Sequence, residues 1–480
     1  MYRVVENPTH QKLLMLISAF AIFMDSLDSS IVNVAMPVIA AEYGVDISAG
    51  SWIVMAYLLI MAGFMLAFGR VADNGKIREV FSIGFFIFAA GSLLSALAPT
   101  LAVMIGARAL QGLGASMIAA AAPLLVTRFL PEGKRGLGMG VIATTGGVAF
   151  TFGPPLGGLL TAFLSWHLIF LINVPIGIAA IAFARAVIPK PASKPQKKPF
   201  DWKGTWLMFA AIASIILFLE RGPVLGWTSI ESIVTGTVFA VSLVWFILHA
   251  LRSDNPLLNV RIFTSWKFSA VSVSYLLTCG VFAGVMYMVP YYMQTSLSLD
   301  AAVSGFLLMI SAVITALVGI PVGAWSDRIG CRVPCILAAL FRISFCLILL
   351  FILPEWGVIA LIPALVCMGF AFGISGGPAT TRIVQFSPKG EEGAGTAVMI
   401  TADFLGGVIG VAAYVVMFAF AVPTSVGIPV AELSADLFLT GFHATAALGL
   451  VFGIITLILS SAVPNLLARR EGENADADQA

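Results

Sequence analysis

Fourteen long apolar stretches constrain this chain more than any other feature, because each has about the length needed to cross a lipid bilayer. A membrane-spanning helix needs about 20 predominantly apolar residues. The stretches are long and do not alternate between apolar and polar residues, so they predict helices rather than barrel strands. The predicted fold class is therefore an all-α integral membrane protein with 14 transmembrane helices. We place the spans at residues 13–37, 51–69, 80–98, 101–127, 137–162, 168–188, 204–220, 232–250, 268–292, 302–325, 333–353, 358–378, 393–418 and 442–463.

The composition excludes a water-soluble enzyme. Of the 480 residues, 60% are hydrophobic and 10% are charged. An average soluble domain is roughly 45–50% apolar and about 25% charged. The 26 basic and 24 acidic residues leave a formal net charge of +2, without the basic excess of a nucleic-acid-binding protein. We therefore expect the lipid bilayer and small molecules as partners, and no nucleic acid.

The cysteines and the lack of a nucleotide-binding loop argue against redox, metal or ATP chemistry. The five cysteines are odd in number and none is paired in a polar external loop, so we expect no disulfide framework. Cys331 and Cys335 have no nearby His, so we interpret them as small apolar residues rather than zinc ligands. No GxxxxGK[ST] loop and no nucleophile constellation occurs. We predict no enzyme activity, no metal and no cofactor.

The distribution of basic residues predicts the orientation. An even number of spans puts both termini on the same side of the membrane, and Lys and Arg concentrate in cytoplasmic loops. With both termini in the cytoplasm, the cytoplasmic segments hold 23 of the 26 basic residues. The exceptions are Arg221 in an external loop and Arg108 and Arg342 within spans. We therefore expect both termini to be cytoplasmic.

An internal repeat divides the chain. GRVADNGKIR begins at Gly69 and GAWSDRIGCR begins at Gly323, and each joins two predicted spans on the cytoplasmic side. Duplicated six-helix halves around a site at the bilayer midplane are the layout of many secondary transporters. We predict an N-terminal half at 1–188, a Pro- and Lys-rich linker at 189–203, a two-helix insert at 204–250, a C-terminal half at 268–463 and an acidic, disordered tail at 464–480.

Two opposite charges are predicted at overlapping depths in the membrane. Asp28 lies about 15 residues into the first span, roughly 22 Å from the cytoplasmic side. Arg108 lies about 8 residues into the fourth span, roughly 12 Å from the other side. Ionisable groups in a span cost from a few to more than 10 kcal/mol unless they face water or a partner. We interpret Asp28 as a proton carrier modulated by Arg108; the alternative is a fixed ion pair joining two helices.

Three further charges lie within spans. Asp25 is one turn before Asp28 and either forms a second proton or cation site or lines a wet cavity. Asp403, near mid-depth in the thirteenth span, is the best acidic candidate of the second half. Arg342 lies at a similar depth in the eleventh span, and it pairs with Asp403 only if those helices touch. Whether Arg342 faces protein or lipid is left open.

Glycine, proline and aromatic residues mark two further spans. GGVAFTFGPPLGG, residues 146–158, predicts a tightly packed kink, acting either as a hinge or in helix packing alone. The ninth span carries Tyr287 and Tyr291 among several methionines, a surface suited to flat apolar ligands. Lipid-facing or interfacial aromatics are the alternative for this span.

Several motifs, in order along the chain, resemble those of the major facilitator superfamily, and more narrowly its 14-span drug:proton antiporters of the EmrB/QacA type. The resemblance covers nearly the whole chain. The matching segments are LDSSIVNVAMP (27–37), RALQGLGAS (108–116), GPPLGG (153–158), WHLIFLINVPIG (166–177) and GAWSDRIGCR (323–332).

The resemblance implies export of structurally diverse toxic compounds, hydrophobic or cationic, driven by proton entry across the inner membrane of a bacterium. We predict proton coupling at Asp28, Arg108, Asp25 and Asp403, and a substrate cavity lined by Gln111, Asn33, Tyr287 and Tyr291. The resemblance itself places the family's conserved acid on Asp28 and the fourth-span motif on Arg108 and Gln111. It places an antiporter hinge at Gly153, Pro154, Gly157 and Gly158. It places cytoplasmic gating at Gly69, Asp73, Arg78, Gly323, Asp327, Arg328, Gly330 and Arg332. EmrB-type relatives often work with a periplasmic adaptor, and the sequence leaves open whether this chain does.

The first gating motif departs from the family pattern. The usual Asp-Arg-x-Gly order is replaced by Asp73 followed by Asn74-Gly75-Lys76-Ile77-Arg78. With the Arg missing and the Gly displaced, we expect a weaker charge relay in which Lys76 and Arg78 substitute only in part.

The sequence thus predicts a proton-coupled secondary exporter working by alternating access. Two other functions stay open. One is a dedicated exporter of a single metabolite on the same fold, which would retain one compound and lose most dyes. The other is a transport-dead membrane sensor or scaffold, for which Asp28→Asn would leave the phenotype intact.

Overall fold

The computed structural model describes residues 4–189, 200–253, 256–388 and 391–465. Most of the predicted linker (189–203) and of the acidic tail (464–480) lies outside these described residues. Every regular element in the described residues is a helix, as the sequence predicts. The α-helices are α1 (Pro8–Glu42), α2 (Ile47–Val71), α3 (Ile77–Ala96), α4 (Leu101–Phe129), α5 (Glu132–Phe163), α6 (His167–Leu171), α7 (Asn173–Val187), α8 (Trp202–Leu225), α9 (Ile230–Arg252), α10 (Trp266–Tyr291), α11 (Ala301–Ile329), α12 (Arg332–Leu347), α13 (Leu353–Trp356), α14 (Val358–Gln385), α15 (Glu392–Ala421) and α16 (Ala435–Ala462).

The membrane-spanning segments agree with the predicted count once one long helical run is divided. In the described residues, 13 runs are long and apolar enough to cross a membrane. One of them, Ile47–Ala96, has 50 residues. At about 1.5 Å per residue it would measure about 75 Å, well beyond a hydrocarbon core of about 30 Å. The run is broken at Asn74 and at Gly75, where φ is 102°. It therefore makes two passes, α2 and α3.

The helices begin where a polar side chain can accept the first free backbone N–H groups. Asn7 accepts from the N–H of Thr9 before α1, and Asp46 accepts from Ala49 before α2. Such caps satisfy donors that have no partner within the helix. Several helices also extend past the predicted spans: α1 runs from Pro8 to Glu42, whereas the apolar pattern predicts 13–37. The polar ends continue the helix beyond the bilayer core.

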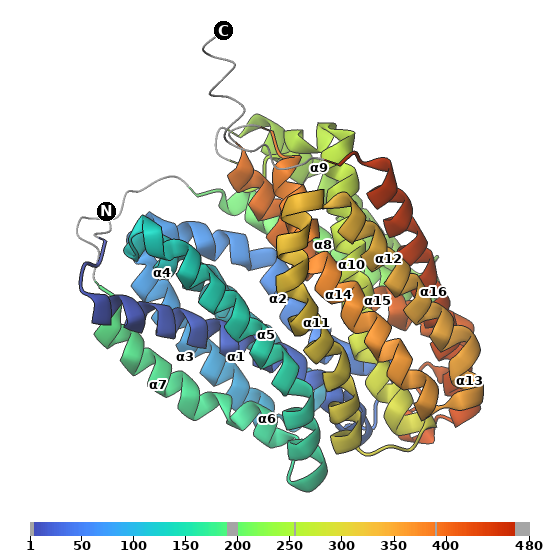
Figure 1. The fold of residues 1–480 in the computed structure, drawn as a ribbon. Helices are drawn as coiled ribbons and strands as arrows, with labels where there is room; N and C mark the ends of the chain where they lie inside the picture. The colour runs from blue at the N-terminus through green and yellow to red at the C-terminus, as the bar shows by residue number, and fades with distance from the viewer. Residues whose placement is uncertain (1–3, 190–199, 254–255, 389–390, 466–480) are drawn as a thin grey trace.

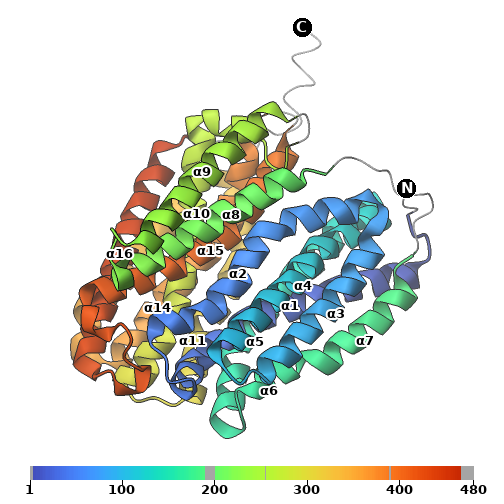
Figure 2. The same ribbon diagram turned by 180° about the vertical axis from the view of Figure 1, so that it is seen from behind.

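The helices form two bundles side by side. Figures 1 and 2 show α1–α7 together in one bundle and α10–α16 in the other, with α8 and α9 along the side seen in Figure 2. Helix α8 contacts α9, α2 and α15. The start of α1 and the end of α16 lie at the same end of the molecule, as do the α2–α3 break and the α11–α12 junction (Figure 1). We call this end the terminal face, and the other end the opposite face.

The two bundles are held together at the opposite face. Tyr287 donates to the carbonyl of Ile47 at 2.7 Å, and Gln294 donates to the carbonyl of Val34 at 2.8 Å. The N–H of Val430 also bonds to the carbonyl of Val45. These bonds join the second half to α1 and to the α1–α2 connection.

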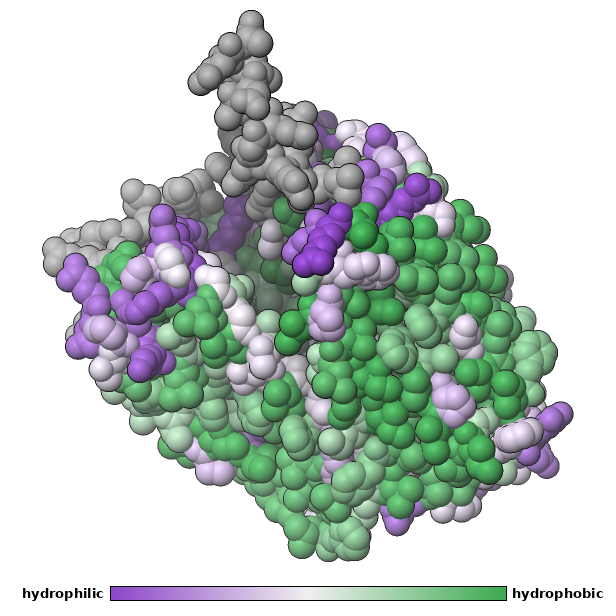
Figure 3. Space-filling model, viewed as in Figure 1, coloured by the Kyte–Doolittle hydropathy of each residue, from purple (hydrophilic) through white to green (hydrophobic). Residues whose placement is uncertain are grey.

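The bundles separate at the terminal face. A cavity of about 1320 Å³ opens there between α2, α4, the end of α9 and the start of α15. Figure 3 shows the surface hollowed beneath a polar rim at this end, and a mostly apolar surface over the rest of the face in view. The molecule is therefore closed at the opposite face and open at the terminal face.

Candidate functional site

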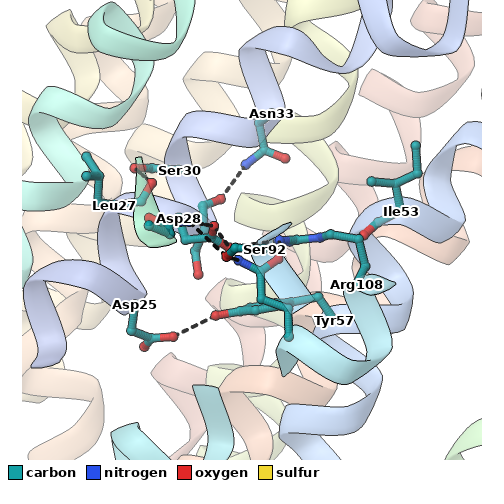
Figure 4. A network of polar contacts seen from close by, with 12 residues as sticks. Asp25, Leu27, Asp28, Ser30, Asn33, Ile53, Tyr57, Ser92 and Arg108 are labelled. Carbon is teal, nitrogen blue, oxygen red and sulfur yellow. Dashed lines mark hydrogen bonds and ion pairs between the residues drawn. The ribbon is translucent and has the colours of Figure 1, made fainter. Parts of the chain in front are cut away.

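The most enclosed charge in the described residues is the carboxylate of Asp28, midway along α1. The residue is 1% exposed, and its side chain accepts three hydrogen bonds (Figure 4). Arg108 of α4 donates to Oδ2 at 2.8 Å. Gln111 of α4 and Asn173 of α7 donate to Oδ1 at 2.7 and 2.8 Å. The predicted overlap in depth of Asp28 and Arg108 is therefore a direct ion pair.

The partners of Asp28 are themselves held in place. Arg108 Nε donates to the carbonyl of Ile53 at 3.1 Å, and its Nη1 donates to Oε1 of Gln111 at 2.6 Å. Its guanidinium lies 4.3 Å from the ring centroid of Tyr57, within the range of a cation–π contact. The Ser92 hydroxyl accepts from Gln111 at 2.7 Å. A buried ion pair is stable only when its remaining donors and acceptors are satisfied, and this shell satisfies them.

The glycines of the fourth-span motif explain how these partners reach Asp28. A Cβ on Gly112 would lie 2.6 Å from the carbonyl oxygen of Tyr57, so α4 and α2 touch there along their backbones. A Cβ on Gly91 of α3 would lie 2.6 Å from the backbone N of Gln111. Small residues permit such close helix approach inside a membrane. The RALQGLG segment thus supplies two of the polar groups and brings Tyr57 and Ser92 to them.

Asp25 belongs to the same network, on the side toward the terminal face. It lies one turn before Asp28 and is half-buried. The Tyr57 hydroxyl donates to Asp25 Oδ1 at 2.8 Å, while the ring of the same tyrosine covers the Arg108 guanidinium. Tyr57 therefore connects the two carboxylates. Asp25 is also within electrostatic range of Asp403 in the other bundle.

Asp403 faces the gap between the two bundles. It lies on α15, one turn beyond Ile400, which lines the terminal-face cavity. Its side chain is exposed although its position is near the middle of the helix. It lies beside Cys279 and Tyr275 of α10. The described residues show no ion pair between Asp403 and Arg342, which is 2% exposed and faces protein.

A second, smaller cavity of about 270 Å³ lies where the two bundles meet. Three phenylalanines from three helices, Phe150, Phe282 and Phe372, form part of its wall. The rings of Phe282 and Phe372 are 4.0 Å apart between centroids. The remaining lining is small or weakly polar: Ser26, Gly146, Gly147, Thr151, Ser311, Ala312, Thr315, Ala316 and Met368. Ser26, which lines this aromatic cavity, directly follows Asp25 in the sequence.

The four residues expected to line a substrate cavity line neither cavity in this conformation. Gln111 is bound within the Asp28 network, and Asn33 donates to the carbonyl of Ser29 at 3.1 Å. Tyr287 and Tyr291 are fully buried. The reason is tertiary: the end of α10 packs across α1 and α2 at the closed opposite face, which covers both tyrosines.

The two gating segments differ in their contacts. Asp73 is bound by Arg128 of α4 through two hydrogen bonds of 2.8 and 2.9 Å. Lys76 is exposed, and Arg78 donates to the carbonyl of Arg185. The counter-charge that replaces the missing motif arginine at Asp73 therefore comes from α4, not from Lys76 or Arg78.

In the second gating segment, Gly330 adopts φ 83° and ends α11, and Arg332 donates to the carbonyl of Ser461. Asp327 and Arg328 are exposed at the terminal face. Gly69 lies in the last turn of α2, and Gly323 lies in the turn before the last of α11. The two segments thus occupy matching places in the two bundles, with an ion pair at Asp73 in the first.

The glycines of the fifth span lie at two helix crossings. A Cβ on Gly157 would meet the carbonyl of Ile31 in α1 at 2.5 Å, and Gly153 faces Ser30 of the same helix. Gly158 faces the backbone of Ala301 in α11. Helix α5 continues through Pro154, so the segment packs closely against both bundles. Its role as a hinge stays a prediction.

Sequence reasoning missed Asn173, Ser92 and Tyr57. The signal for Asn173 was present: it is an amide within the apolar segment WHLIFLINVPIG. A polar side chain inside a span is costly unless it has a partner, so it should have been counted with the charges. Ser92 and Tyr57 carried no comparable signal, because both residue types are common in such helices.

Comparison with known families identifies the fold. The family model described as Major Facilitator Superfamily matches residues 18–411. This chain belongs to the Major Facilitator Superfamily. It is a multi-pass membrane transporter and not an enzyme.

Two relatives from this superfamily cover most of the chain. The riboflavin transporter RibZ of Clostridioides difficile (strain 630) is 29% identical over 413 residues, 85% of this chain and 88% of RibZ. The multidrug resistance protein Stp of Mycobacterium tuberculosis (strain H37Rv) is 29% identical over 408 residues, 84% of this chain and 75% of Stp. The likeness to Stp agrees with the resemblance to EmrB/QacA-type drug:proton antiporters.

Two solved transporter structures share the fold. A bacterial homologue of the human lysosomal transporter Spinster superposes with a TM-score of 0.66 at 13% identity, covering 95% of this chain and 98% of that one. The nucleoside transporter NupG superposes with a TM-score of 0.65 at 12% identity, covering 93% and 99%. At these identities the likeness concerns the fold alone.

Proposed function

We propose that this chain is a proton-coupled secondary transporter that exports amphipathic organic molecules, with the terminal face in the cytoplasm of a bacterium. The observation that carries the proposal is the buried Asp28–Arg108 pair, connected through Tyr57 to Asp25 on the side of the open cavity. Ionisable groups inside a membrane span are costly and commonly mark ion or proton pathways. The excess of basic residues on the terminal face supports its cytoplasmic orientation.

The coupling step follows from the charges. While Asp28 is ionised, its carboxylate compensates Arg108 and holds α1, α4 and α7 together through three donors. A proton delivered to Asp28 removes that charge and leaves Arg108 without its counter-ion. The three helices then gain less from staying in this arrangement, so the relative energy of the two conformations changes. Asp25 is the nearer carboxylate to the cavity and receives or releases the proton first.

The substrate class follows from the aromatic cavity. Its phenylalanines offer flat apolar surface, and Ser26, Thr151, Ser311 and Thr315 offer neutral hydroxyl groups. Asp25 and Asp403 add two carboxyl groups where the bundles meet. Aromatic faces and carboxylates together favour a planar organic cation.

The test uses inverted membrane vesicles with an acidic lumen. Addition of ethidium, as a planar cation probe, should collapse the pH gradient in the wild type, and Asp28→Asn should reduce the rate by about tenfold or more. Asp436→Asn, which changes an exposed carboxylate at the start of α16, should behave as the wild type. No response to ethidium or to a panel of neutral and anionic dyes would contradict multidrug export.

A second candidate is export of one metabolite, and the likeness to RibZ favours it. In that case riboflavin, but not ethidium, would collapse the gradient in the same vesicles. If neither compound acts and Asp28→Asn leaves the cellular phenotype intact, both candidates are contradicted.

A further inference from the structure

Arg342 of α12 is a buried charge with no hydrogen-bond acceptor in the described part of the chain. The residue is 2% exposed, and Nε, Nη1 and Nη2 all lack a partner. The ring centroid of Phe372 lies 6.0 Å from its guanidinium carbon. A guanidinium does not lose its proton in proteins, so it cannot escape the cost by becoming neutral. An unpaired charge buried in the membrane is strongly unfavourable.

The other buried arginines do not share this condition. Arg108 has Asp28, Gln111 and the carbonyl of Ile53. Arg382 of α14 donates to the carbonyls of Ser460 and Val463, at the end of α16, where helix carbonyls carry partial negative charge. In this conformation Arg108 and Arg382 therefore have hydrogen-bond acceptors, whereas Arg342 has none among the described residues.

The groups around Arg342 are weak acceptors. Cys335 and Cys346 of its own helix, Cys279 of α10 and Tyr414 of α15 are the titratable groups within electrostatic range. The Tyr414 hydroxyl also has no hydrogen-bond partner among the described residues. The strong acceptor Asp403 lies one side chain further away, because Cys279 is beside Asp403 and is also within electrostatic range of Arg342. Besides Cys279, the titratable groups near Asp403 are Tyr275 and Asp25.

The crossing of α15 and α10 next to Asp403 is made of glycines. A Cβ on Gly280 would lie 3.1 Å from the carbonyl oxygen of Gly406, and Gly410 packs directly on the backbone of Gly280. At Gly280 the contact is formed by the backbones of Gly406 and Gly410, and one turn further the Tyr414 ring of α15 packs on Gly284 of α10. Packed helices can shift past one another by small sliding displacements. A displacement of α15 along α10 would move Asp403 relative to Cys279 and Arg342.

We propose that Arg342 is the counter-ion that Asp403 reaches when the terminal face closes. This inference rests on alternating access in the proposed function. In the open state Asp403 faces water between the bundles and Arg342 is unpaired. Ionised Asp403 gains Arg342 on closure, so loss of its proton favours the closed state. Protonation of Asp403 removes that gain and returns the molecule to the open state.

The experiment measures the closing directly and needs no substrate. Spin labels on unnatural amino acids at Glu79 in α3 and Val333 in α12, both exposed at the terminal face, leave the five native cysteines untouched. Pulsed electron resonance on the full chain in nanodiscs gives the distance distribution between the labels. Between about pH 5.5 and about pH 8, we expect the short-distance population of the wild type to rise several-fold.

Three single variants and one double variant test the pair. Arg342→Gln and Asp403→Asn should each abolish most of the pH-dependent rise, and the double variant should lose no more than either alone, because both remove one interaction. Arg342→Lys keeps the charge and should retain part of the rise. Arg382→Gln, the matched buried arginine, should keep the full pH-dependent rise whatever it does to stability.

The outcomes distinguish failure of this inference from failure of the proposed transport function. A wild type without pH-dependent closing, or an Asp403→Asn variant that closes like the wild type, would overturn the inference even if ethidium export is observed. If Arg342→Gln does not fold, Asp403→Asn and Arg342→Lys still test the inference. Conversely, a pH-dependent rise lost in both single variants, without gradient collapse by any compound, would support the pair and contradict the exporter.

Discussion

The side chains of Asp28 and Arg108 lie 2.8 Å apart at the closest, and they are 0% and 2% exposed. The pair joins α1 to α4, and Gln111 and Asn173 complete the shell around the carboxylate. Buried pairs of this kind contribute less to stability than their distance suggests, since desolvation offsets most of the attraction. Removing one partner is nevertheless costly, because the other charge stays buried alone.

The first prediction is that Asp28 and Arg108 are energetically coupled. Arg108→Gln should destabilise the purified protein by about 3–5 kcal/mol, and Asp28→Asn by a similar amount. The double variant should recover part of the loss, because no uncompensated charge remains. Thermal unfolding of the wild type, the two single variants and the double variant in detergent at neutral pH measures the coupling. Strictly additive losses would show that the two side chains act separately.

The second prediction concerns the crossing of α5 and α11. Gly158→Leu should weaken the contact between the two bundles, because its side chain would enter the backbone of Ala301. We expect a destabilisation of about 1–3 kcal/mol from overpacking. Gly140→Ala in the same helix has nothing within 4 Å and should be neutral or slightly stabilising. Equal melting temperatures for Gly158→Leu and the wild type would be evidence against a tight crossing.

The third prediction is that the Asp73–Arg128 pair governs conformation more than stability. Its side chains are 41% and 49% exposed, so the pair should contribute only about 0.2–1 kcal/mol to folding. Asp73→Asn should leave the melting temperature nearly unchanged while it alters the transport rate in vesicles. Raising the salt concentration should reproduce part of the effect in the wild type, because ions screen exposed charges. A large loss of stability would assign the pair a structural role instead.

The fourth prediction is a pH dependence at the start of α8. Burial opposes ionisation of Asp201, yet the N–H groups of Gly204 and Leu257 and the His249 ring hold the pKa of its carboxyl below the usual value. Stability from this group is therefore fully present above about pH 4 and is lost as the pH falls through the lower folded-state pKa. Asp201→Ala should cost about 1–2 kcal/mol at neutral pH.

Melting temperatures of Asp201→Ala and the wild type, compared at neutral pH and near pH 3, provide the measurement. The difference should shrink in acid. Asp300→Ala is the control for loss of a helix cap alone, because Asp300 caps α11 through one N–H without a histidine partner. A difference between Asp201→Ala and the wild type that grows in acid would contradict the assignment.

The sequence by itself determined the fold class, the number of passes and the depth of the intramembrane charges. Hydropathy is a local property, so runs of apolar residues report the helices directly, and the cost of a charge in lipid makes Asp25, Asp28, Arg108 and Asp403 conspicuous. The depth estimate for Asp28 and Arg108 placed them at the same level, and the structure joins them.

Only the tertiary structure decided which polar groups meet. Asn173 and Ser92 lie 145 and 64 positions after Asp28 along the chain, and they reach its shell because glycines let the helices approach closely. Tyr287 and Tyr291 are covered because the bundles close at the opposite face, and Arg342 faces protein without an acceptor. Contacts between helices depend on their rotation and packing, which a single span does not encode, so pairing, exposure and conformational state emerge only when the helices assemble.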